Sequence, residues 1–189
     1  MKPHSVLRGV LGAAVFCAAF GSPIAAQTPE EVAAAALTAA PVWDGHNDVP
    51  WQLRVRYQNA IDDFDFVDTT DTGTDDRNPM HTDLLRLAKG KVGAQFWSVY
   101  VSTSLSDPQA VLATLEQIDV ARRLIDQNSE DLAFALTADD VDRARKSGKI
   151  ASMLGMEGGH SIGSSLAVLR QMYDLGARYM TLTHSANTP

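Results

Sequence analysis

Along this chain, segments whose apolar positions have the spacing of a strand alternate with segments whose apolar positions have the spacing of a helix. The clearest strand pattern covers residues 92–101, and shorter ones cover 41–46, 132–136, 150–156 and 178–183. Helical periodicity, capping residues and glycine stops predict helices over 27–40, 82–89, 108–128, 138–146 and 163–175. Repeated strand–helix alternation is typical of a parallel sheet with helices outside it, so the predicted fold class is α/β.

The alternation favours a (β/α)₈ barrel of the TIM type, of which this chain offers about the first five strands. A complete barrel needs about 250 residues, whereas the chain has 189. We therefore expect residues 27–189 to be the N-terminal part of a single barrel domain. Open sheets and barrels of this class place their sites at the carboxyl ends of the strands, so residues that follow the strands are the first candidates.

Two segments test this interpretation in detail. The longest predicted helix, 108–128, places Val111, Leu115, Ile118 and Ile125 on one face, which we expect to be buried. Residues 58–80 are rich in Asp and Thr and contain few large apolar side chains, which predicts an irregular surface insertion. The aspartates of this insertion lack the glycine and closing glutamate of an EF-hand loop, so we expect solvated side chains and not a calcium site.

The first 26 residues have the order of a secretory signal peptide. Lys2 and Arg8 precede an apolar run over residues 10–20, and small residues end the segment at Ala26. The apolar run is too short for a membrane span, which needs about 20 residues. We expect cleavage before Gln27 and export to the periplasm or the outside, with an uncleaved anchor and membrane association as the alternative.

Composition limits the classes of partner. The only cysteine is Cys17, inside the expected signal peptide, so the remainder has no disulfide to hold it together. Removing residues 1–26 takes away two basic residues and no acid, which makes the rest more negative than the −7 of the whole chain. A chain of this charge would not neutralise phosphates, so nucleic acid is not an expected partner.

The residues that suggest chemistry follow two of the predicted strands. His46 and Asp48 stand two positions apart at the end of 41–46, so in an extended strand both would point to the same side. Glu157 follows the apolar run 150–156. One imidazole and two carboxylates at one end of a sheet would suit a divalent metal. The alternative is that His46 is a histidine at a strand end, Asp48 caps the following turn and Glu157 is a solvated loop acid.

The chain resembles the membrane (renal-type) dipeptidase family of zinc peptidases. The resemblance is carried by four runs in order, Trp43-Asp44-Gly45-His46-Asn47-Asp48, Gly93-Ala94-Gln95-Phe96-Trp97-Ser98, Glu157-Gly158-Gly159-His160-Ser161 and Leu182-Thr183-His184-Ser185-Ala186-Asn187. It implies a (β/α)₈ barrel of the metal-dependent hydrolase type, two Zn²⁺ ions in the complete site, and small peptides, namely dipeptides, as substrates. No transmembrane span is expected once the signal segment is removed.

The resemblance also implies roles. His46 and Asp48 would bind the first zinc, Glu157 would bridge both zincs, and His184 would contact the substrate and help to stabilise the oxyanion. The family's further ligands, two histidines from later strands with a substrate-binding Arg and an Asp, are expected beyond residue 189. Zinc would lower the pKa of a bound water toward about 7, and the resulting hydroxide would attack the peptide carbonyl.

Other interpretations stay open. The same barrel could carry another two-metal amide or ester hydrolase, or the chain could be a non-catalytic secreted α/β domain. His160 either packs and orients its neighbours or contacts substrate or metal, and Asp44 either orients a ligand or braces the turn at Gly45. An open sheet edge would favour self-association, with a homodimer as one form.

Overall fold

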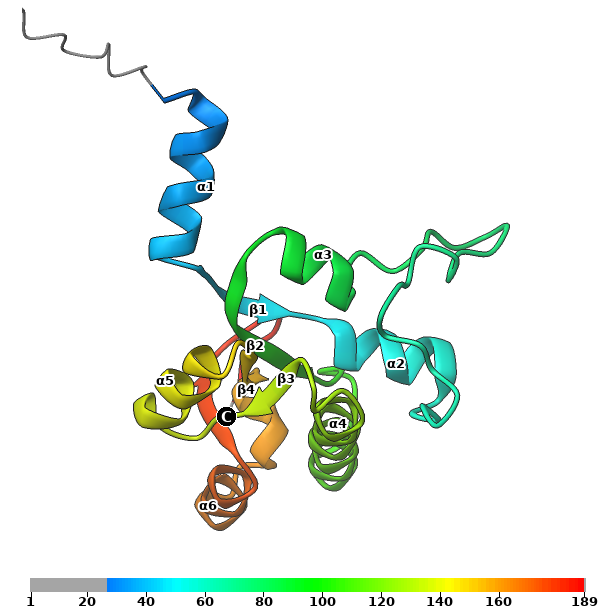
Figure 1. The fold of residues 1–189 in the computed structure, drawn as a ribbon. Helices are drawn as coiled ribbons and strands as arrows, with labels where there is room; N and C mark the ends of the chain where they lie inside the picture. The colour runs from blue at the N-terminus through cyan, green and yellow to red at the C-terminus, as the bar shows by residue number, and fades with distance from the viewer. Residues whose placement is uncertain (1–26, 189) are drawn as a thin grey trace, which may run out of the picture.

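The computed structural model describes residues 27–188, which contain a five-stranded parallel sheet (Figure 1). The strands are β1 (Val42–Asn47), β2 (Val92–Tyr100), β3 (Leu132–Phe134), β4 (Ile150–Glu157) and β5 (Ala177–Thr181). All four strand pairings are parallel, which confirms the predicted α/β class. Over the described residues the sheet is a partial barrel that does not close. The predicted signal peptide, residues 1–26, lies outside the described residues.

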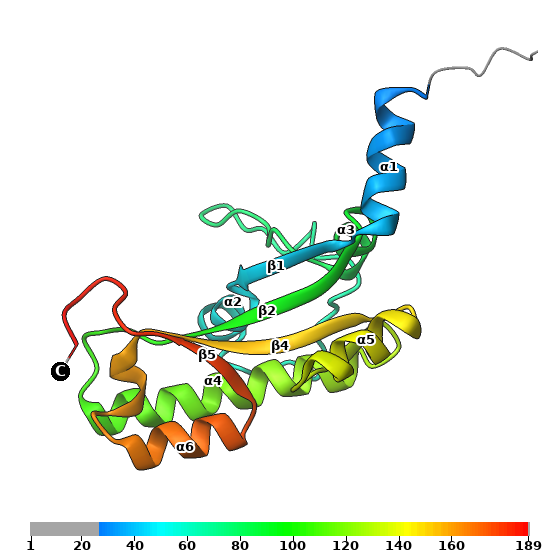
Figure 2. The same cartoon turned by 90° about the vertical axis from the view of Figure 1, so that its left-hand side faces the viewer.

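The strand order is β1-β2-β4, and the far edge of β4 is shared by two strands. β3 pairs with the first residues of β4, at Ile150 to Ser152, and β5 pairs with its last residues, at Leu154 to Glu157. Since β3 has only three residues, it leaves the carboxyl half of β4 free for β5. The carboxyl ends of β1, β4 and β5 therefore lie at the same end of the sheet (Figure 2).

The helices are α1 (Pro29–Ala39), α2 (Val49–Tyr57), α3 (Leu84–Lys89), α4 (Asp107–Gln127), α5 (Ala138–Lys146), α6 (Leu166–Asp174) and the 3₁₀ helix η1 (Gly159–Ile162). Every predicted helix is present, but α2 was not predicted, because its residues show almost no apolar periodicity. The start predicted for the last helix is three residues too early. Gly163 and Ser164 have left-handed φ values of 53° and 56°, so the helix begins only after Ser165, which caps it.

The predicted apolar face of α4 is partly wrong. Ile118 and Ile125 are buried as expected, but Leu115 is 38% exposed and Val111 only partly buried. The buried stripe runs instead through small residues such as Ala113 and Ala121. Small side chains let the helix approach its neighbours closely. The two larger residues face a groove beside α6.

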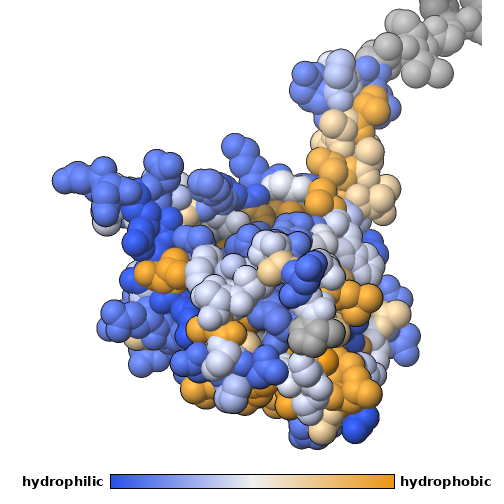
Figure 3. All heavy atoms as spheres, turned by 180° about the vertical axis from the view of Figure 1, so that it is seen from behind, coloured by the Kyte–Doolittle hydropathy of each residue, from blue (hydrophilic) through white to orange (hydrophobic). Residues whose placement is uncertain are grey.

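Helix α1 stands away from the rest of the molecule. None of its residues is buried, and Figure 3 shows apolar side chains along it. Thr28 and Glu31 form a capping box at its start. Within residues 27–188 no helix has the length and apolar character needed to cross a bilayer.

Alternation along β2 and β4 separates the core from the candidate site. Trp97, Val99, Leu154 and Met156 belong to the main core cluster, which includes the buried residues of α4. The intervening residues lie on the opposite face, since successive side chains alternate. In the register, Ser98 lies beside Gly155 and Tyr100 beside Glu157. The polar residues of the sheet's carboxyl end therefore share the face away from this core.

The insertion between α2 and α3 is irregular, as predicted, but it is not merely a surface loop. Its few large apolar residues include Ile61, Phe66 and Met80, which are buried in the main core. Its aspartates at 62, 63, 65, 68, 71, 75 and 76 are exposed, as expected of solvated side chains. The insertion is thus attached to the sheet by its apolar residues, with its charges outside.

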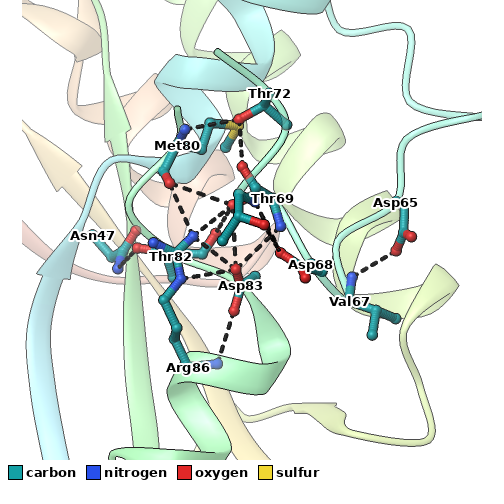
Figure 4. A network of polar contacts seen from close by, with 11 residues as sticks. Asn47, Asp65, Val67, Asp68, Thr69, Thr72, Met80, Thr82, Asp83 and Arg86 are labelled. Atoms are coloured by element: carbon teal, nitrogen blue, oxygen red, sulfur yellow. Dashed lines mark hydrogen bonds and ion pairs between the residues drawn. The ribbon is translucent and has the colours of Figure 1, made fainter. Parts of the chain in front are cut away.

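A polar network closes this insertion (Figure 4). The buried Asp83 carboxylate accepts hydrogen bonds from the backbone N–H groups of Thr69 and Arg86 and pairs with the Arg86 guanidinium at 2.7 Å. Burial alone would raise the pKa of Asp83, but the hydrogen bonds from Arg86 and Thr69 outweigh it and hold that pKa below its usual range. We call Thr69, Asp83 and Arg86 the insertion network.

Candidate metal centre

His46 is placed by an irregularity in β1. Along β1 the register advances from Asp44 to Asn47, while along β2 it advances only from Gln95 to Trp97, so β1 carries one extra residue. Such a bulge interrupts the alternation of side chains and redirects the residue it contains. The His46 N–H donates to Asp44 Oδ1 at 3.1 Å, so Asp44 braces the bulge at Gly45.

Asp48 reaches the site by a different route from the one its spacing predicts. β1 ends at Asn47, and Asp48 is the N-cap residue of α2. Its side chain makes no capping hydrogen bond, so the carboxylate is free to face His46. Strand alternation is therefore the wrong reason for the meeting of His46 and Asp48; the bulge and the helix start bring them together.

The described residues contain one cluster that could hold a metal ion, formed by His46, Asp48 and Glu157, whose ligand atoms all lie within 4.8 Å of one another. His46 Nε2 lies 3.4 Å from Asp48 Oδ1 and 3.3 Å from Glu157 Oε2. Two ligands of a tetrahedral zinc, each about 2.1 Å from the ion, are about 3.4 Å apart. These contacts are also longer than charge-assisted hydrogen bonds, which measure about 2.7–2.9 Å. We call the three residues the metal-site cluster.

Glu157 is the inner member of this cluster, with a side chain 12% exposed. The buried Ser98 hydroxyl donates to Oε2 at 2.9 Å, and His184 Nε2 lies 2.9 Å from Oε1. Each oxygen of the carboxylate therefore has its own neighbour from another element, which fixes the orientation of the carboxylate.

The electrostatic balance of the cluster suits a cation. Among residues 27–188, the ion-pair contacts of Asp48 and Glu157 are with histidines and not with Lys or Arg. The two carboxylates thus lack a permanently charged partner among these residues, and carboxylate with imidazole is a zinc donor set. The residues present thus fit a zinc ion in both chemistry and spacing.

Tyr179, on β5, lies against the cluster. Its hydroxyl donates to Gly45 O at 3.1 Å and lies 3.4 Å from His46 Nδ1. Burial raises the pKa of Tyr179, and the negative charges of Glu157, Asp48 and Asp44 raise it further. The hydroxyl therefore keeps its proton at neutral pH and remains a donor.

His184 and His160 occupy different positions. His184 follows the end of β5 by three residues; its side chain is 40% exposed, and its ring meets the Tyr100 ring edge-on at 5.6 Å. It borders the cluster through Glu157 while remaining open to solvent. His160 turns away: its Nε2 lies 2.9 Å from Val101 O, which fits a packing and orienting role.

A cavity of about 570 Å³ opens beside His46 and Asp48, and residues 76–82 of the insertion line its other side. This is enough room for a small molecule, within the usual range of ligand sites. A larger cavity of about 610 Å³ lies among residues at the amino-terminal ends of the strands and contains none of the predicted site residues.

Sequence reasoning gave no role to Ser98 or Tyr179. Ser98 stands, like Gln95, as a buried polar residue in a mostly apolar strand, which is a signal that could have been followed. Tyr179 gave no such signal, since tyrosine is common in strands. Its place beside His46 depends on the sheet order, which periodicity does not reveal.

Solved structures with a similar fold include a metallopeptidase from Rhodobacter sphaeroides liganded with a phosphinate mimic of the dipeptide L-Ala-D-Ala, at 21% identity and a TM-score of 0.62, covering 78% of this chain and 46% of that one. The dipeptidase AC, a metallopeptidase of family M19, matches at 24% identity and a TM-score of 0.64, covering 77% and 43%. The probable dipeptidase PvdM from Pseudomonas aeruginosa matches at 17% identity and a TM-score of 0.53, covering 64% and 33%.

The chain therefore spans less than half the length of these solved structures, with which it shares the fold. A family model of wider coverage matches residues 30–189, which include all the predicted site residues. On that match, the chain belongs to the membrane dipeptidase family, Peptidase family M19.

Proposed function

We propose that this chain contributes to the zinc-dependent hydrolysis of dipeptides. The observation that carries the proposal is the metal-site cluster, in which His46 Nε2 faces two carboxylates at 3.4 and 3.3 Å. Family membership and the dipeptide mimic bound to the Rhodobacter sphaeroides relative support the substrate class. The cavity beside His46 and Asp48 has room for a small peptide.

In this proposal, different residues of the chain would bind the metal, orient the Glu157 carboxylate and donate a hydrogen bond to the substrate. His46, Asp48 and Glu157 would hold the zinc ion, and Ser98 keeps the Glu157 carboxylate oriented by its hydrogen bond. When bound, zinc would supply Lewis-acid chemistry by polarising a carbonyl oxygen and acidifying a water. His184, solvent-exposed at the rim, would donate a hydrogen bond to the carbonyl oxygen as its negative charge grows.

The two carboxylate oxygens of Glu157 face different residues. Its Oε2 faces His46, and its Oε1 faces His184 on the other side. We propose that Glu157 would be shared by the two ions of a complete two-zinc site. In this proposal His46, Asp48 and Glu157 would hold the first of the two ions.

The test begins with metal binding. The metal-free chain is titrated with Zn²⁺ against a chelator of known affinity, beside His46→Ala and an exposed control outside the cavity, Glu130→Ala. We expect one tightly bound zinc per chain, lost in His46→Ala and kept in the control. Absence of stoichiometric zinc, or zinc retained in His46→Ala, would contradict the proposal.

Hydrolysis of Ala-Ala and Gly-Leu by the zinc-loaded chain tests the reaction itself. Turnover that disappears in His46→Ala and Glu157→Ala supports the dipeptidase assignment. Zinc binding without turnover of any dipeptide would favour a non-catalytic domain, and cleavage only of other amides or esters would favour a different two-metal hydrolase.

We propose further that the protein is exported. The support is the order of residues 1–26, with basic residues, an apolar run and small residues at the end. N-terminal sequencing of the protein recovered from expressing cells is expected to begin at Gln27. A mature protein that begins at Met1 would contradict cleavage.

A further inference from the structure

The Tyr179 side chain lies across the face of the sheet that points away from the main core. Tyr179 lies beside Gly155 in the register of β5 and β4. A Cβ atom at Gly155 would lie 2.1 Å from Tyr179 Cζ, so the phenol ring lies directly over the Gly155 backbone. The space for the ring exists because residue 155 has no side chain.

The ring extends from β5 across the sheet to β1. Its centroid lies 5.0 Å from that of Phe96, on β2, with 54° between the ring planes. Beyond Phe96, the hydroxyl reaches Gly45 O at 3.1 Å and His46 Nδ1 at 3.4 Å. A residue of the last strand therefore contacts the metal-site cluster at the first strand.

The two nitrogens of His46 face different groups. Nε2 faces the carboxylates of Asp48 and Glu157, while Nδ1 faces the Tyr179 hydroxyl. A neutral imidazole carries one proton, and a nitrogen that binds metal must present its lone pair. If Nε2 is the ligand atom, the proton belongs on Nδ1.

The hydrogen-bond partners of Tyr179 agree with this placement. The hydroxyl has one hydrogen, which Gly45 O accepts, because a carbonyl oxygen can only accept. The hydroxyl oxygen is then free to accept the Nδ1–H of His46. The chain of donors runs from His46 to Tyr179 to the Gly45 carbonyl.

We infer that Tyr179 is a positioning residue that holds His46 in the tautomer presenting Nε2 to the metal. The inference depends on the metal centre proposed above. Groups that accept the second N–H of a metal-binding histidine fix its ring, and losing one typically costs about 10–100-fold in metal affinity or activity. The alternative is that the ring of Tyr179 only fills the space over Gly155.

Tyr179→Phe separates the two roles, because it keeps the ring and removes the hydroxyl. Zn²⁺ affinity of the chain is measured by chelator competition for the wild type, Tyr179→Phe and the control Tyr173→Phe, whose tyrosine is exposed on α6. We expect zinc binding to weaken by about 10-fold or more in Tyr179→Phe, and to be unchanged in Tyr173→Phe. Equal affinity in Tyr179→Phe and the wild type would overturn the inference.

Nitrogen-15 NMR of the histidine rings provides a second readout that needs no variant. In the zinc-bound wild type, His46 is expected to carry its proton on Nδ1 and its metal on Nε2. Zinc on Nδ1, or a proton on Nε2, would overturn the inference even if Tyr179→Phe failed to fold. A wild-type chain that binds no zinc would overturn the metal centre itself. This result is distinct from the two results that would overturn only the role of Tyr179, namely unchanged affinity in Tyr179→Phe and the wrong His46 tautomer.

Discussion

Glu157 and Asp83 are two carboxylates with little exposure, 12% and 1% of the side chain, but they have opposite kinds of partner. Asp83 pairs with the guanidinium of Arg86 and accepts backbone hydrogen bonds. Glu157 accepts one hydroxyl hydrogen bond and faces two imidazoles. Asp83 therefore has a permanently charged partner, whereas the described partners of Glu157 are a hydroxyl and two imidazoles.

The difference separates a structural acid from a candidate ligand. A buried carboxylate needs a counter-charge, because removing it from water is costly. For Asp83 the counter-charge is a permanent part of the chain, so the insertion network serves stability. For Glu157 and its neighbours a cation from solution would supply it, in line with the metal-binding role proposed for the metal-site cluster.

Glu157→Ala should have the largest effect on binding. It removes a proposed ligand, so Zn²⁺ affinity is expected to fall by more than about 100-fold, beyond the usual cost of losing an outer-shell contact. Chelator competition measures this, with the exposed Glu130→Ala as the matched control. Without zinc, the same change should cost less free energy of unfolding than Asp83→Ala. A variant that keeps wild-type affinity would remove Glu157 from the site.

Asp83→Ala should have the largest effect on stability. It leaves the Thr69 and Arg86 N–H groups without their acceptor and the guanidinium without its partner. We expect a loss of about 2–4 kcal/mol in the free energy of unfolding, measured with urea. The exposed Asp71→Ala, in the same insertion, should leave the urea midpoint unchanged. Equal midpoints for Asp83→Ala and the wild type would contradict a structural role.

The pH dependence of stability should report Asp83. Its pKa is lowered in the folded protein, so its contribution is present above the ordinary aspartate value of about 3.9 and is lost as pH falls through the folded value. Urea unfolding of the metal-free chain from about pH 6 to about pH 3 should show this acid loss. Asp83→Asn should be less stable at neutral pH. Its stability should also fall less on acidification, because the contribution of Asp83 is absent, and the fall that remains comes from the other carboxyls of lowered pKa, which both chains keep. Parallel curves would show that Asp83 does not contribute.

Asn47→Ala should have the smallest effect on stability and on zinc binding. The Asn47 side chain links the insertion to the turn that carries His46 and Asp48. Asn47 Nδ2 donates to Thr82 Oγ1 at 3.1 Å, next to Asp83, and its Oδ1 accepts from Val49 N–H. We expect a loss of about 1 kcal/mol in unfolding free energy and a decrease in Zn²⁺ affinity of less than about 10-fold. A double-mutant cycle with Thr82→Val measures the coupling. Strict additivity would mean that the insertion does not help to place the His46–Asp48 turn.

Much of the fold was predictable because long apolar segments indicate burial and capping residues mark the ends of helices. The strand 92–101 and the helix 138–146 match β2 and α5 to within a residue. Helix α2 was missed because Arg and Gln interrupt its apolar positions, and the start of α6 because two left-handed residues precede it. Local periodicity also cannot specify that β4 pairs with β2 while β3 lies at its other edge.

The candidate site was predicted in identity better than in geometry. His46, Asp48 and Glu157 converge, but the alternation argument assumed a regular strand through Asp48, where the chain has a bulge and a helix start. Ser98 and Tyr179 depend on which strands are neighbours, which requires the three-dimensional structure. The roles of all four predicted residues, including His184, remain predictions for the experiments above.

The extra residue in β1 makes this region sensitive to length as well as to composition. Deleting Gly45 would regularise the strand and turn the imidazole to the other side of the sheet, without changing any chemical group that the site uses. Insertions between Thr70 and Asn78, where every residue except the half-buried Thr72 is exposed, should be tolerated far better. Natural variation within this family is therefore expected to show gaps in the outer loop and an unchanged residue count between Trp43 and Asp48.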